Sequence, residues 1–109
     1  MASMRIVLTT VGLQEKAEEL ARTLVVRRLA ACVNIMGPIR SVYRWKGAIE
    51  NEQEYLLLIK TSAERAAELE AAFVELHPYK LPERIDLDIA GGSSAYLSWV
   101  VEQLEHEGQ

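Results

Sequence analysis

The stretch AACVNIMGPIRSVYRWKGAIENEQEYLLLIKT, residues 30–61, decides the fold of this chain. Both of its halves are rich in β-branched and aromatic residues, which favour strands, and the Lys46-Gly47 dipeptide between them is a turn signal. The sequence therefore predicts two antiparallel strands, 30–47 and 48–61, joined as a hairpin. Gly37-Pro38 interrupts the first strand and predicts a bend or bulge there.

The arms of this hairpin are unusually long. If they pair along their whole length, each has about 12 to 14 residues and spans roughly 40 Å, about twice a usual strand. The distal half is therefore expected to project beyond a domain of this size. It carries apolar and aromatic side chains that need a cover, and Trp99 further along the chain is a similar anchor for the core or an interface. The predicted interface or structural residues are Tyr43, Trp45, Ile49, Tyr55 and Trp99.

The segments around the hairpin complete a β-α-β-β-α-β-α order. The apolar, β-branched stretch MRIVLTTV predicts a strand, and the LQEKAEELARTLVVRRL segment after Gly12 has apolar residues at helical spacing, including Leu13 and Val25. Thr61 and Glu64 have the spacing of a capping box for the second helix, which Pro78 should end. The expected ranges are a strand over 4–11, a helix over 13–29, a helix over 61–77, a strand over 84–90 and a helix from Ser93 or Ser94.

This order predicts one α+β domain over residues 1–109, a ferredoxin-like split βαβ sandwich with its helices on one face of an antiparallel sheet. In the strand over 84–90, Ile85, Leu87 and Ile89 alternate with charged residues and should form a buried face. The sheet face opposite the helices then needs a cover. A closed ring of identical subunits would provide one for every copy equally.

The composition excludes several classes of partner. The formal net charge is -4 and no basic stripe is present, so a nucleic acid is not expected. The chain has no apolar run of membrane-spanning length and no signal-peptide pattern, which predicts a cytoplasmic protein without a membrane partner. Cys32 is the only cysteine, so an intrachain disulfide and a cysteine-rich zinc site are excluded.

Few residues offer chemistry. Cys32 is either a small buried hydrophobe or a soft metal ligand, and His77 is either a metal ligand or a helix-end residue with an exposed, charged ring stabilised by the helix dipole. The alternating acids Glu50, Glu52 and Glu54 fit a solvated strand face better than a cation site. No nucleophile and base pair is evident, so the sequence does not predict an enzyme.

Five blocks of the sequence resemble a known family. RLAACVNI, SVYRWKGAIE, EYLLLIKT, LHPYKLPE and AYLSWV are similar, in order and spacing, to the signature blocks of the CutA divalent-cation tolerance proteins. The resemblance implies a PII-like, ferredoxin-like subunit assembled as a homotrimer through its long hairpins. It also implies a role in tolerance of copper and other divalent metal ions, with Cys32 and His77 as the candidate metal-binding residues and no organic cofactor.

An alternative function remains open beside metal binding. The family often has an acid where this chain has Lys80 and an apolar residue where it has Arg84. Two cations near Tyr79 would repel a metal ion and attract an anion. The alternative is thus a PII-like trimeric sensor or scaffold that binds a small anionic ligand or a partner protein at subunit clefts, through Tyr79, Lys80 and Arg84.

Overall fold

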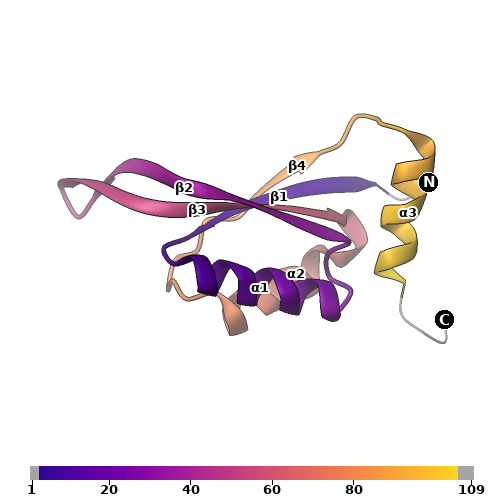
Figure 1. The fold of residues 1–109 in the computed structure, drawn as a ribbon, viewed down its shortest axis with the longest axis horizontal. Helices are drawn as coiled ribbons and strands as arrows, with labels where there is room; N and C mark the ends of the chain where they lie inside the picture. Colours follow the sequence, from indigo (N-terminus) through magenta and orange to yellow (C-terminus); the bar gives the residue numbers. More distant parts are fainter. Residues whose placement is uncertain (1–2, 106–109) are drawn as a thin grey trace.

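The computed structural model describes residues 3–105 and shows a four-stranded antiparallel sheet with two helices packed against one face (Figure 1). The strand order is β2-β3-β1-β4. This arrangement confirms the predicted ferredoxin-like α+β architecture. The elements are β1 (Met4–Val11), α1 (Gln14–Val26), β2 (Cys32–Trp45), β3 (Ala48–Ser62), the 3-10 helix η1 (Ala63–Arg65), α2 (Ala66–Leu76), β4 (Ile85–Asp88) and α3 (Ser94–Leu104).

The β2-β3 hairpin is the long element that the sequence predicted. Its arms pair from Cys32 opposite Lys60 to Trp45 opposite Ala48, with a register shift between Met36 and Ile39, at the predicted Gly37-Pro38 irregularity. Figure 1 shows both arms extending well past α1 and α2. The principal extents are 48 × 27 × 21 Å and the radius of gyration is 14.7 Å, against about 13 Å for a compact domain of roughly 100 residues. The predicted overhang is confirmed.

The main core lies between the sheet and the two helices. Because side chains alternate along a strand, one face of the sheet carries Val7 and Val11 of β1 together with Leu57 and Ile59 of β3. These residues pack against the apolar side of α1 and against Leu69, Ala72 and Phe73 of α2, and all are at least 97% buried. We call this side of the sheet the covered face.

The opposite side of the sheet is mostly uncovered. Helix α3 lies at one end of the sheet, where Val100 and Leu104 form a small second core with Met4 and Ala31. Alternation and register place the remaining apolar side chains of this side in one patch, which we call the open face. It consists of Ile6, Leu8, Met36, Leu56, Leu58, Ile85 and Leu87. Ile85 and Leu87, predicted to be buried, are each 47% exposed because α3 does not reach them.

The start of the second helix differs from the prediction, whereas the start of α3 confirms it. The Thr61–Glu64 capping box is wrong: β3 continues to Ser62, and the Thr61 hydroxyl donates instead to the Leu29 carbonyl oxygen at 2.8 Å. Helix α3 begins as predicted, with the Ser93 hydroxyl accepting a hydrogen bond from the Tyr96 backbone N–H.

The first helix is shorter than predicted at both ends. Leu13 precedes α1 and is 58% exposed, and Val25 is 43% exposed in the last turn. The helix ends at Val26 because Arg28 adopts a left-handed conformation (φ 59°), which turns the chain toward β2. Within residues 3–105, no helix is long and apolar enough to cross a membrane.

Candidate functional site

His77 lies immediately after α2, at the point where the chain turns back toward the sheet. Its backbone is extended (φ −71°, ψ 133°), as expected for a residue before proline, and its N–H closes the last turn of α2 on the Phe73 carbonyl. The imidazole packs between the rings of Phe73 and Tyr79, with centroid separations of 5.6 and 5.1 Å. The residue is only 8% exposed, so the expectation of an exposed ring is wrong.

Both ring nitrogens of His77 already have partners. Nδ1 accepts a hydrogen bond from the Tyr79 backbone N–H at 3.1 Å, and Nε2 lies 3.0 Å from the Thr9 hydroxyl oxygen of β1. Because Nδ1 accepts, we assign the proton of the neutral ring to Nε2, which then donates to Thr9. Burial lowers the pKa of His77, and smaller effects of a backbone hydrogen bond to Thr10 and of the Glu54 charge oppose it. A neutral ring, and not the predicted charged one, fits this site.

Tyr79 links the loop after α2 to the hairpin. Its hydroxyl donates to a carboxylate oxygen of Glu54 at 2.8 Å, and a Cβ at Gly12 would lie only 3.1 Å from that hydroxyl, which explains the glycine between β1 and α1. The pKa of Tyr79 is raised by burial first and then by the bond to Glu54. Tyr43 is opposite Glu50 in the hairpin register. Desolvation raises its pKa, and the charges of Glu52, Glu54 and Glu50 add to this shift.

Cys32 begins β2 on the other side of the sheet. Its cross-strand partner is Lys60, which is in turn opposite Ile6 of the open face. The thiol is half-buried and can donate a weak hydrogen bond to the Asn34 side-chain oxygen, 3.8 Å away. Val33, the next residue, packs against the main core, as alternation requires.

The two predicted metal-binding residues of one chain therefore do not converge. Cys32 lies on the open face, whereas His77 contacts Thr9, which lies on the covered face between the core residues Val7 and Val11. Among residues 3–105, no three His, Cys, Asp or Glu side chains are grouped closely enough to hold a metal ion. A site that uses both residues has to take them from different chains.

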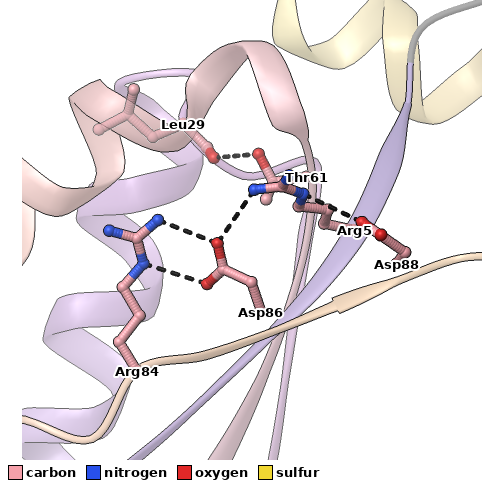
Figure 2. Close-up of polar contacts among 6 residues, drawn as sticks. All are labelled: Arg5, Leu29, Thr61, Arg84, Asp86 and Asp88. Carbon is pink, nitrogen blue, oxygen red and sulfur yellow. Dashed lines mark hydrogen bonds and ion pairs between the residues drawn. The ribbon is translucent and has the colours of Figure 1, made fainter.

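The predicted anion-binding residues are also separated. Arg84 donates two hydrogen bonds to the Asp86 carboxylate, at 3.1 and 3.0 Å (Figure 2). Arg5 of β1 forms ion pairs with both Asp86 and Asp88. This ion-pair network fastens the edge strand β4 to β1 and neutralises Arg84. Tyr79 is bound to Glu54 and Lys80 is exposed, so one chain does not bring the three side chains to a common anion.

The predicted interface residues fall into two groups. Tyr43, Trp45 and Ile49 lie on the projecting part of the hairpin and are 42%, 47% and 63% exposed. Trp99 is 42% exposed on α3, where it stacks on Tyr96. Tyr55 is different, because it pairs with Val11 and packs against the main core and not on the overhang.

The structure adds two functional-site residues that the sequence reasoning missed. Glu54 was grouped with Glu50 and Glu52 as a solvated face, yet it is 7% exposed because Tyr79 covers it. Thr9 was treated as part of an apolar strand. The signal for Thr9 was present: a hydroxyl in a fully buried strand needs a hydrogen-bond partner, and His77 provides it.

Fold and site together define a ferredoxin-like protein with an extended hairpin and an open sheet face. Its polar residues after the second helix, His77 and Tyr79, are hydrogen-bonded to Thr9 and Glu54 of the sheet. The family model "CutA1 divalent ion tolerance protein" matches residues 5–103. A "Divalent-cation tolerance protein CutA" from Thermus thermophilus is 45% identical over 97 residues, which are 89% of this chain and 94% of the relative. A CutA homolog from Xenopus laevis is 45% identical over 84 residues, 77% of this chain but only 56% of that longer protein.

Solved structures agree with this assignment. The Cut A1 structure from Thermus thermophilus superposes with a TM-score of 0.90 at 43% identity, covering 94% of this chain and 99% of that one. The CutA structure from Synechococcus elongatus gives 0.91 at 41% identity, covering 96% and 93%. The chain belongs to the CutA1 divalent ion tolerance family, as the five sequence blocks predicted.

Proposed function

We propose that this chain serves in divalent-cation tolerance, as its relatives' names state for them, and that it acts as a homotrimer. The observation that carries the proposal is the open face, an apolar patch that α3 leaves uncovered, next to a hairpin that projects past the helices. Contiguous apolar surface of this kind is usually buried against a partner. A closed ring covers the open face of every copy in the same way.

Metal ions are, in this proposal, bound weakly at or between the subunits. Because Cys32 and His77 of one chain lie on opposite faces, a site containing both combines residues from two copies. A thiolate and an imidazole favour copper or zinc over magnesium or calcium. His77 would have to release Thr9 or Tyr79 before a nitrogen could ligate, and this rearrangement weakens the affinity.

The proposed role is the binding of metal ions and not catalysis. The proposed location is the cytoplasm. The polar groups after α2 are paired with one another: His77 with Thr9 and Tyr79, and Tyr79 with Glu54. Such pairing holds a loop in place but leaves no activated base beside a nucleophile. Cell fractionation with an antibody against the chain tests the location.

Light scattering tests the assembly. The native chain should have the mass of three copies, and Leu87→Asp should reduce it because it places a carboxylate on the open face. Val74→Asp is the matched control: Val74 is 84% exposed on the outer side of α2, so this variant should keep the trimer mass. A native mass of one chain would contradict the proposal.

Calorimetric titration of the metal-free protein tests metal binding. Copper(I), copper(II) and zinc should each be compared between the native chain, Cys32→Ala, His77→Ala and the double variant. Heat that both single variants reduce would support a shared site. Equal heats in the native chain and the double variant would show that these residues do not bind the metal, while leaving the assembly unaffected.

A further inference from the structure

A small cavity lies between α3 and the end of the sheet, on the same side of the sheet as the open face. Its volume is about 180 Å³, and its walls are almost entirely apolar, with Ile6 and Ile89 on one side and Leu97 and Val100 of α3 on the other. An apolar cavity of about 150 Å³ is large enough to stay dry and to bind benzene. This one can therefore hold an apolar group the size of an aromatic ring.

Among residues 3–105, Lys60 of β3 is the cationic side chain that lines the cavity. The ammonium nitrogen lies 3.4 Å from the Tyr96 hydroxyl and 5.6 Å from the centre of the Tyr96 ring. None of the carboxylates in residues 3–105 forms an ion pair with Lys60. An ammonium without a carboxylate, at the edge of apolar walls, is complementary to an anion that carries an apolar body.

The start of α3 adds to this polarity. Gly91, Gly92 and Ser93 form the segment that leads into the helix, and all three line the cavity. The N-terminal end of an α-helix carries a partial positive charge from its aligned peptide dipoles. Both the Lys60 ammonium and the N-terminal end of α3 therefore favour a negative group at this place. The apolar walls disfavour a fully hydrated inorganic ion.

We infer that this cavity binds a small monocarboxylate whose apolar body is about the size of a benzene ring. The ring or short alkyl chain occupies the space among Ile6, Ile89 and Leu97, and the carboxylate binds Lys60. The site does not require the metal binding proposed for Cys32 and His77, although Lys60 is the cross-strand neighbour of Cys32. Benzoate is the simplest probe of this chemistry.

Benzoate titration of the full chain, followed by the methyl NMR signals of Ile89, Leu97 and Val100, tests the inference. These signals should shift and saturate with benzoate. Benzamide, a neutral molecule of the same shape, should bind about tenfold more weakly because it lacks the charged hydrogen bond. Inorganic phosphate should leave the same signals in place, since it has no apolar body.

Two variants separate the charge from the cavity. Lys60→Gln should remove the preference for benzoate over benzamide but keep residual binding of both. Gly92→Leu should weaken both probes, because a Cβ at Gly92 would contact the Leu97 side chain at ordinary distances of 3.5–3.7 Å and a larger side chain would narrow the space. Lys80→Gln is the matched control for the charge, since Lys80 is exposed and does not line the cavity. This control should bind benzoate like the native chain.

Several results would overturn the inference. Saturating benzoate that leaves the three methyl signals unmoved would show that the cavity takes no such ligand. Equal affinity for benzoate in the native chain and in Lys60→Gln would remove the role of the charge. Binding seen only in a dissociated variant such as Leu87→Asp would show that a second copy of the chain, and not a carboxylate, occupies the cavity in the assembly.

Discussion

The two faces of the sheet are built from the same strands but differ in how far their apolar side chains are buried within one chain. On the covered face, Leu57 and Ile59 are fully buried by α1 and α2, and even the polar Thr9 has a buried partner in His77. On the open face, Ile85 and Leu87 remain half exposed, and Cys32 and Lys60 lie at the surface of the same side. The covered face is complete within one chain, whereas the open face leaves apolar side chains exposed to solvent.

This difference determines which residues affect folding and which affect association. Residues on the covered face contribute to the stability of each subunit. In the trimer that we propose, residues on the open face would contribute mainly to contacts with other copies. Neighbouring residues on one strand face opposite sides, so adjacent substitutions can separate the two contributions.

The largest expected effect comes from Leu57→Ala, which opens a cavity in the covered core. It should lower the free energy of unfolding by about 2–5 kcal/mol, measured by urea denaturation, and keep the assembled mass below the transition. Leu58→Ala, on the open face next to it, should cost less stability but cause dissociation at higher protein concentration in light scattering. Equal behaviour of the two variants would contradict the division between the faces.

Thr9→Val should have the next largest effect. The substitution keeps the shape of the side chain but removes the hydroxyl acceptor for the buried Nε2–H of His77. A loss of about 1–3 kcal/mol in the free energy of unfolding is expected. Thr10→Val is the control, since alternation along β1 points the Thr10 side chain to the face opposite Thr9 and His77. It should cost less stability; the reverse order would rule out the assigned hydrogen bond.

The pH dependence of stability is a third test of the covered face. Burial lowers the pKa of His77, so the unfolded chain binds a proton near pH 6.5 that the folded chain does not bind. The free energy of unfolding should therefore fall as the pH is lowered through about 6.5, and level off below the folded-state pKa. His77→Gln should show a shallower dependence between pH 7.5 and 5.5, about the range in which histidine titrates. Identical slopes would argue against a buried neutral ring.

The smallest expected effect is that of Cys32→Ala on the open face. Because the thiol is half-buried and makes only a weak contact with Asn34, the free energy of unfolding should change by about 0.5 kcal/mol or less. A maleimide reagent should label this thiol in a dissociated variant such as Leu87→Asp, because the thiol is half-buried in one chain. A large loss of stability would show that Cys32 is a core residue and not part of the open face.

Most of the fold could be predicted because its determinants are local. Hairpin length, the Gly37-Pro38 irregularity and the Ser93 cap follow from composition and turn chemistry over a few residues. The capping box at Thr61 failed because a tertiary contact with Leu29 extended β3 past the expected boundary. Local spacing alone does not reveal that competition.

The candidate site was harder to predict because its contacts join distant segments. His77 and Thr9 are 68 residues apart and Tyr79 and Glu54 are 25 apart, so the sequence suggested the residue types but not their pairing. The face on which each residue lies depends on strand register. The separation of Cys32 from His77 followed only from that register.

The pairing of the edge strand β4 with β1 is expected to be a late step in the folding of the sheet. Strand β4 pairs through only four residues, and these residues join Arg5 to Asp88, 83 positions away, whereas the hairpin pairs neighbouring segments. Contacts this distant carry the largest loop-closure cost and are expected to form late in folding. The ion pairs of Arg5 and Arg84 with Asp86 then hold β4 against β1. In amide hydrogen exchange, the backbone amides of β4 should exchange before those of β1 and β3.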